Sequence, residues 1–136
     1  DIPLLHIGDA IAAAVHDSGA IRPLLLATRF AMEQDFYLGY LRESHGIHAV
    51  VPKERDRMEV HRVIYEELCQ GKVLDSSTRA YMQIIDRACS DADAPADSVI
   101  FGCTEIGLLI TSGDFLIPAF DTTVLHAEAA LTFAGY

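Results

Sequence analysis

The alternation of short apolar runs with longer segments of helical periodicity constrains this chain more than any other feature. The short runs have the composition of buried strands, and the segments between them repeat apolar residues at helical spacing. Parallel strands must be joined by crossover connections of about a dozen or more residues, usually a helix, and the segments between the short runs can supply them. We therefore predict βαβ units with right-handed crossovers and a three-layer, doubly wound α/β domain with a mostly parallel sheet. The strands are expected at residues 2–7, 23–28, 48–51, 98–102 and 117–120.

Capping residues mark the predicted helix boundaries. Asp9 and Asp75 are placed to cap the first turns of helices, and the last helix is expected to start near Asp121. Glycines that follow periodic segments predict helix ends. The helices are expected at residues 9–16, 31–44, 54–70, 75–90 and 122–133, with a short one after residue 102 and with stops at Gly19, Gly46 and Gly71.

One segment has the features of a functional site. An apolar run ends at Gly102 and is followed by Cys103, Thr104 and Glu105. A buried strand would deliver the cysteine to its carboxyl end, where open α/β sheets bind their ligands. A helix starting at Thr104 would favour the thiolate of Cys103 through its free N–H groups and its dipole. The alternative is a buried structural cysteine at a strand end.

Gly-Cys-Thr-Glu after a hydrophobic strand resembles the second active-site motif of the cofactor-independent aspartate/glutamate racemase superfamily. Order and spacing of further blocks are similar to the aspartate racemase branch, including its broad-specificity amino-acid racemases. These blocks are residues 2–7 (IPLLHI), 25–29 (LLATR), 32–37 (MEQDFY), 64–68 (IYEEL) with Gly71, 118–122 (PAFDT) and 126–128 (HAE).

The resemblance implies a catalytic role for Cys103 and substrate contacts for its neighbours. In the family, two cysteines, one from each of two similar domains, remove the Cα proton from one face and return a proton to the other. A cysteine suits both tasks, because its reference pKa of about 8.5 leaves thiol and thiolate accessible. Cys103 matches the second-domain cysteine. Thr28 and Thr104 are implied to hold the substrate carboxylate, and Glu105 to accept the substrate ammonium or tune the Cys103 proton.

Several of these residues also have structural interpretations. Thr28 could cap the following helix, and Glu105 could be a first-turn glutamate favoured by the helix dipole. Cys69 and Cys89 are expected to be structural, because each falls near a helix end among core-type residues. Some aspartate racemases place a lysine for the distal carboxylate where this chain has Met58 or a neighbour, so the resemblance leaves broader specificity open.

The domain pattern of the family implies a division of this chain. Residues 1–120 resemble the second α/β domain, and residues 121–136 are expected to form a closing helix that packs on the first domain. The partner cysteine is then expected before Asp1, and the chain is interpreted as partial. The helix at 122–133 carries more apolar surface than packing against one sheet face would bury, so we expect it to contact another chain or the first domain. The family also implies a homodimer.

Composition excludes other classes of function. Twenty acidic residues against ten basic ones give a net charge of −10, which argues against nucleic acid or an anionic membrane as a partner. No apolar stretch approaches the roughly 20 residues of a membrane span. The three cysteines lack metal-type pairing and suit a reducing cytoplasm. No metal and no cofactor are predicted, and there is no glycine-rich phosphate loop.

The predicted function is therefore cofactor-independent racemisation of an amino acid (aspartate, glutamate or a broader range) by a two-cysteine mechanism. The partial chain alone is expected to be inactive. Glutamate racemases usually carry histidine after Gly-Cys-Thr, so Glu105 favours the aspartate branch. The alternatives are glutamate racemase, a hydantoin racemase or maleate isomerase-type enzyme, and a non-catalytic binding or interaction domain.

Overall fold

A parallel three-stranded sheet forms the centre of the computed structural model, which describes residues 3–135. The strands are β1 (Pro23–Leu26), β2 (Ser98–Phe101) and β3 (Ala119–Asp121), in the order β1-β2-β3. Leu26 pairs with Phe101, which in turn pairs with Asp121, so the three strands end at one level. This arrangement confirms the predicted α/β class with a parallel sheet.

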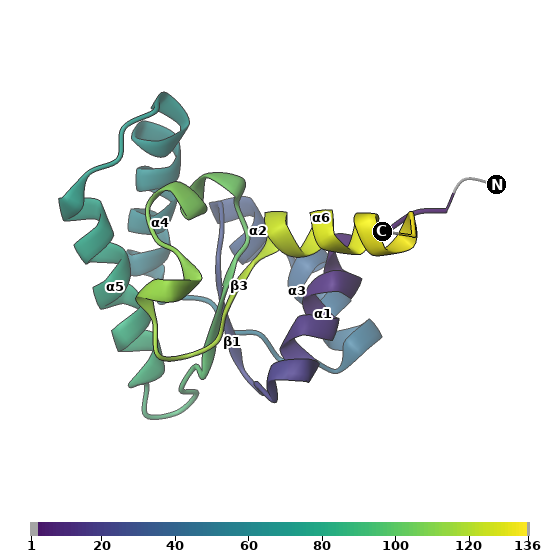
Figure 1. The fold of residues 1–136 in the computed structure, drawn as a ribbon. Helices are drawn as coiled ribbons and strands as arrows, with labels where there is room; N and C mark the ends of the chain where they lie inside the picture. Colours follow the sequence, from purple (N-terminus) through teal and green to yellow (C-terminus); the bar gives the residue numbers. More distant parts are fainter. Residues whose placement is uncertain (1–2, 136) are drawn as a thin grey trace.

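Helices form two layers, one on each face of the sheet. In Figure 1, α1, α3 and α6 lie on one side, and α4 and α5 on the other. Both faces must be covered because every residue of β1 and β2 is buried. The helices are α1 (Ile7–Ser18), α2 (Arg29–Glu33), α3 (Asp35–His45), α4 (Glu54–Glu66), α5 (Asp75–Cys89) and α6 (Thr122–Phe133), with 3₁₀ turns η1 (Leu68–Gln70), η2 (Thr104–Leu108) and η3 (Ser112–Asp114).

Two of the five predicted strands are absent from the sheet. Of the predicted strand at 2–7, Ile2 lies outside the described residues, 3–6 form no strand, and α1 begins at Ile7. His6 instead caps α1, because its Nδ1 accepts the backbone N–H of Gly8 at 3.0 Å. The predicted strand at 48–51 is reduced to a single parallel bridge between Leu24 and Val50. Pro52, which has no N–H to donate, follows directly.

The helix boundaries also differ from prediction in places. The helix expected at 31–44 is two helices, because Gln34 has an extended backbone (φ −91, ψ 142) between α2 and α3. The helix expected at 54–70 ends at Glu66 and continues as η1. Asp75 lies in the first turn of α5, where the dipole favours a carboxylate, and does not cap it. The cap expected near Asp121 is confirmed, since this carboxylate accepts the N–H of Thr123 and of Val124.

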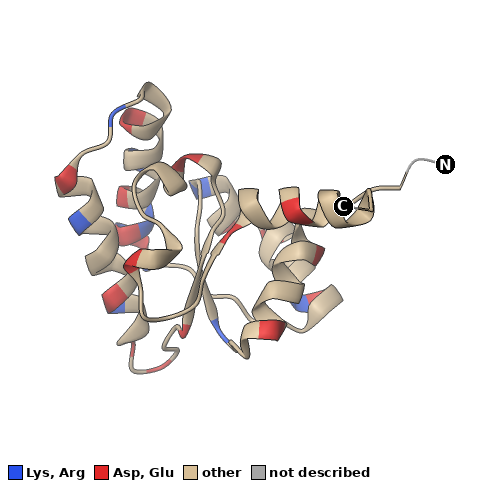
Figure 2. Cartoon of the chain, viewed as in Figure 1, with Lys and Arg blue, Asp and Glu red and all other residues tan. Residues whose placement is uncertain are grey.

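Helix α6 carries apolar residues around its circumference and is incompletely covered within this chain. It packs mainly against α1, with fewer contacts to β3. Its one charged residue is Glu128 (Figure 2). Val124, Leu131 and Phe133 remain 51%, 56% and 60% exposed. Across residues 3–135, no helix combines the length and the apolar character needed to cross a membrane.

Candidate active site

The ends of two neighbouring strands bring Thr28 and Cys103 to one edge of the sheet. β1 and β2 are parallel and adjacent, and their last paired residues are Leu26 and Phe101. The pairing continues one step further, because the N–H of Gly102 donates to the carbonyl of Leu26 at 2.7 Å. Thr28 and Cys103 each follow two residues after the end of their strand. Both therefore lie at the carboxyl edge, where open α/β sheets bind ligands.

A close backbone approach explains why glycine precedes Cys103. A Cβ on Gly102 would lie 2.8 Å from Leu25 Cδ1, 3.0 Å from Ala27 Cβ and 3.2 Å from the Leu26 carbonyl oxygen. Real Cβ atoms are almost never found less than 3.0 Å from another heavy atom, so the approach to Leu25 is the closest constraint. The glycine thus lets β2 approach the end of β1 and fixes where Cys103 leaves the sheet.

Cys103 is a half-buried thiol whose proton is held by a carboxylate. Its Sγ donates a hydrogen bond to Oε2 of Glu105 at 2.8 Å. Burial and the Glu105 carboxylate raise the pKa of Cys103 to about 12. The expectation that the helix start favours a thiolate is therefore wrong. η2 is a 3₁₀ turn of five residues, and its N–H groups do not offset burial and the adjacent negative charge.

Glu105 accepts two hydrogen bonds that stabilise its charged form. Besides the Cys103 thiol, the Thr104 hydroxyl donates to the same Oε2 at 2.7 Å. These hydrogen bonds lower the pKa of Glu105, that from Cys103 having the larger effect. One proton thus lies between Cys103 and Glu105, and it is bonded to the sulfur. The Thr104 hydroxyl must turn away from Glu105 before it can donate to another carboxylate.

Thr28 occupies the cap position of α2 without acting as a cap. Its backbone is extended (φ −62, ψ 157), but its side chain makes no capping hydrogen bond. The structural interpretation of Thr28 as a side-chain cap is therefore wrong. The N–H of Arg29 donates instead to Nδ1 of His61 at 3.0 Å. The Arg29 guanidinium pairs with Glu33, with 2.8 Å between Nε and Oε2.

Two residues that the sequence did not assign to this edge lie close to it. Cys69 is exposed on η1, which packs against η2, and its charge when ionised is near enough to raise the pKa of Cys103. The expectation of a core position for Cys69 is wrong, because α4 ends at Glu66, before it. His61 lies beside Thr28 through its bond to the following N–H. Its spacing in α4 gave no signal for this contact. Cys89 is half-buried, and burial raises its pKa.

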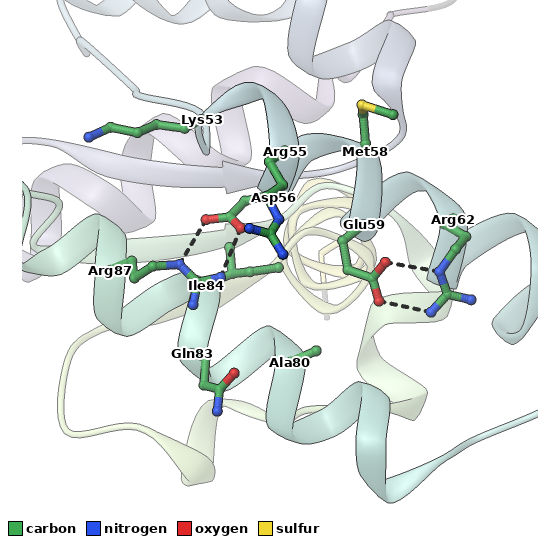
Figure 3. A pocket seen from close by; sticks show the side chains of 10 residues that line it. All are labelled: Lys53, Arg55, Asp56, Met58, Glu59, Arg62, Ala80, Gln83, Ile84 and Arg87. Atoms are coloured by element: carbon green, nitrogen blue, oxygen red, sulfur yellow. Dashed lines mark hydrogen bonds and ion pairs between the residues drawn. The ribbon is translucent and has the colours of Figure 1, made fainter.

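A groove of about 830 Å³ lies away from this edge, along α4 and α5, and its lining includes neither Cys103 nor Thr28. Figure 3 shows that paired charges occupy it. Arg87 of α5 binds both carboxylate oxygens of Asp56 in α4, at 2.8 and 3.0 Å. Arg62 binds both oxygens of Glu59 within α4. Within residues 3–135, no three His, Cys, Asp or Glu side chains gather as metal ligands would. We interpret the groove as a helix–helix contact.

Comparison with known proteins gives consistent matches over most of the chain. A family profile described as Asp/Glu/Hydantoin racemase matches residues 1–130. The structure is similar to a candidate Asp/Glu racemase from Yersinia pestis, with 45% identity, a TM-score of 0.90, and coverage of 98% of this chain and 56% of that one.

Two archaeal structures are also similar. An aspartate racemase homologue from Pyrococcus horikoshii has 32% identity, a TM-score of 0.87, and coverage of 100% and 58%. An aspartate racemase from Picrophilus torridus has 24% identity and a TM-score of 0.67, with coverage of 99% and 54%, and shares the fold. The chain thus spans little more than half the length of these solved relatives.

Proposed function

The chain belongs to the Asp/Glu/hydantoin racemase family, and we propose that it supplies one half of the active site of a cofactor-independent amino-acid racemase. The observation that carries the proposal is the Cys103 thiol at the carboxyl edge of the sheet, with its proton directed at Glu105. The second thiol is proposed to come from a second domain, since the solved relatives are longer than this chain.

The proposed reaction inverts Cα by two proton transfers on opposite faces. A thiolate on one face takes the Cα proton, and the Cys103 thiol gives its proton to the other face. One C–H bond breaks, another forms, and the two sulfurs exchange protonation states. The raised pKa of Cys103 supports its assignment as the proton donor of the resting enzyme, because the thiol is fully protonated at neutral pH.

Glu105 is proposed to control how readily the Cys103 thiol ionises. Once Cys103 has given up its proton, a thiolate stands beside a carboxylate, and like charges at this distance repel. The substrate ammonium, placed against Glu105, would neutralise the carboxylate and ease that ionisation. The same contact would orient the amino acid, so the two roles that the sequence left open for Glu105 support one another.

Substrate binding is proposed to use the hydroxyls beside Cys103. The side chain of Thr28 is not committed to capping α2 and can donate to an α-carboxylate. Thr104 offers a second hydroxyl at the same edge. The guanidinium of Arg29, the residue after Thr28, is paired with Glu33. These surroundings support a substrate range that extends beyond aspartate and glutamate to neutral amino acids.

The apolar surface of α6 is proposed to pack against the remainder of the enzyme. Val124, Leu131 and Phe133 are more than half exposed, and apolar patches of this kind promote association. We assign this surface to the contact with the second domain, and the complete enzyme to a homodimer in the cytoplasm, where free thiols persist. Light scattering of the present chain and of L131E/F133E tests the surface. Self-association that the substitutions abolish supports it, and a monomeric wild-type chain contradicts it.

Racemisation assays of the complete enzyme, without added pyridoxal phosphate, test the function. L-aspartate, L-glutamate and several neutral L-amino acids are followed by circular dichroism. We expect activity in the wild type, a loss of about 100-fold or more in Cys103→Ser, and little change in Cys89→Ser as the matched control. Near-normal activity of Cys103→Ser would contradict the assignment. Amino-acid binding without racemisation by the wild type would favour the non-catalytic alternative.

A further inference from the structure

His61 connects α4 to the residues that follow β1. Its Nδ1 accepts the backbone N–H of Arg29, the first residue of α2, at 3.0 Å. Its half-buried ring packs on Tyr65 of the same helix, with ring centroids 4.6 Å apart and an interplanar angle of 38°. The bond spans 32 positions in sequence. It therefore ties two segments that no local preference would hold together.

The bond satisfies an N–H that the cap residue does not normally reach. At an N-cap position, the hydroxyl oxygen of a threonine typically accepts the N–H of the second or third helical residue, not of the first. Thr28 has the cap position and an extended backbone but makes no such bond. His61 instead satisfies one first-turn N–H from a neighbouring helix. The start of α2 is thus tied to α4 at the residue that follows Thr28.

We propose that His61 is a positioning residue that anchors the start of α2 to α4, and so holds Thr28, the preceding residue, where its hydroxyl can reach the substrate carboxylate. The inference rests on the proposed function for the identity of that ligand. Because Nδ1 is an acceptor here, the neutral ring carries its proton on Nε2. Without His61, the Arg29 N–H loses its partner. The start of α2, and with it the preceding Thr28, is then no longer held against α4.

Amide hydrogen exchange and ring-nitrogen NMR test the bond between His61 and Arg29 independently of activity. We expect the Arg29 amide to be protected, and His61 to show the Nε2–H tautomer. His61→Asn keeps an acceptor at the place of Nδ1 and should retain protection. His61→Leu should speed Arg29 exchange by about tenfold or more, which corresponds to the loss of one hydrogen bond. His48→Leu, at an exposed histidine, is the matched control. An Arg29 amide that exchanges equally fast in wild type and His61→Leu would overturn the proposal.

Kinetics of the complete enzyme test the consequence for the substrate. His61→Leu should raise KM about tenfold with little change in kcat, because a carboxylate contact serves the ground state and the transition state alike. His61→Asn should restore KM, and Thr28→Val should add little to His61→Leu, since both act on one contact. An unchanged KM in His61→Leu overturns this inference alone. A wild type that neither racemises nor binds amino acids overturns the proposed function, while the exchange result still decides whether His61 anchors α2.

Discussion

Replacing Glu105 by glutamine should lower the pKa of the Cys103 thiol. Glutamine keeps an oxygen that can accept the thiol hydrogen bond at the observed 2.8 Å, and it removes the negative charge. A neighbouring like charge typically shifts a pKa by about 1–3 pH units. Cys103 is half-buried, so solvent screening reduces the expected change to about 1–2 units, or about 1.4–2.7 kcal/mol. Burial, the largest cause of the raised value, remains, so the pKa should fall from about 12 but stay above 9.0.

The pH dependence of alkylation by iodoacetamide measures this shift. The background is Cys69→Ser with Cys89→Ser, which leaves Cys103 as the only thiol of the three in the sequence. Glu43→Gln removes a carboxylate from the exposed side of α3 and serves as the charge control. The midpoint should move down in Glu105→Gln alone. An unchanged or higher midpoint in Glu105→Gln would refute the argument that the carboxylate holds the proton on sulfur.

Three further predictions concern stability, each checked by urea denaturation. Gly102→Ala should cost about 1–3 kcal/mol, because its Cβ would overlap Leu25 and Ala27; Gly113→Ala, with its nearest atom at 3.8 Å, is the control, and an equal effect of both would contradict the close approach. Tyr37→Phe should be neutral or stabilise by about 1 kcal/mol, because within residues 3–135 its buried hydroxyl has no hydrogen-bond partner; a clear loss would contradict this. Stability should fall as pH rises from 9.0 towards 12, because the unfolded chain loses the Cys103 proton at lower pH than the folded chain does. The free energy of unfolding of Cys103→Ser should therefore fall less over this pH range. The same pH slope in wild type and Cys103→Ser would contradict this prediction.

The sequence predicted the core of the fold because its strongest signals were local. The apolar runs at 23–26 and 99–101 indicated strands buried on both faces, and Asp121 marked the start of α6. The first predicted strand failed for a tertiary reason. The apolar residues at 3–5 have no sheet partner among the described residues, and the His6 side chain caps α1 instead.

The candidate site was predicted where it depends on strand ends and missed where it depends on packing. Cys103 and Thr28 follow apolar runs, so parallel pairing alone brings them to one edge. The protonation of Cys103 follows from its burial and the rotamer of Glu105, which spacing does not encode. His61 reaches Arg29 across 32 positions. Only the packing of α4 beside α2 creates that contact.

Proton exchange at Cα in D₂O tests whether Cys103 serves one face of the substrate. The complete enzyme is incubated with each enantiomer of its best amino-acid substrate, and deuterium at Cα and optical inversion are followed together. We expect Cys103→Ser to lose inversion by about 100-fold or more and to retain deuterium incorporation for one enantiomer only, because the opposite-face base still works. Inversion near the wild-type rate, or equal loss of exchange in Cys89→Ser, would contradict the assignment of Cys103.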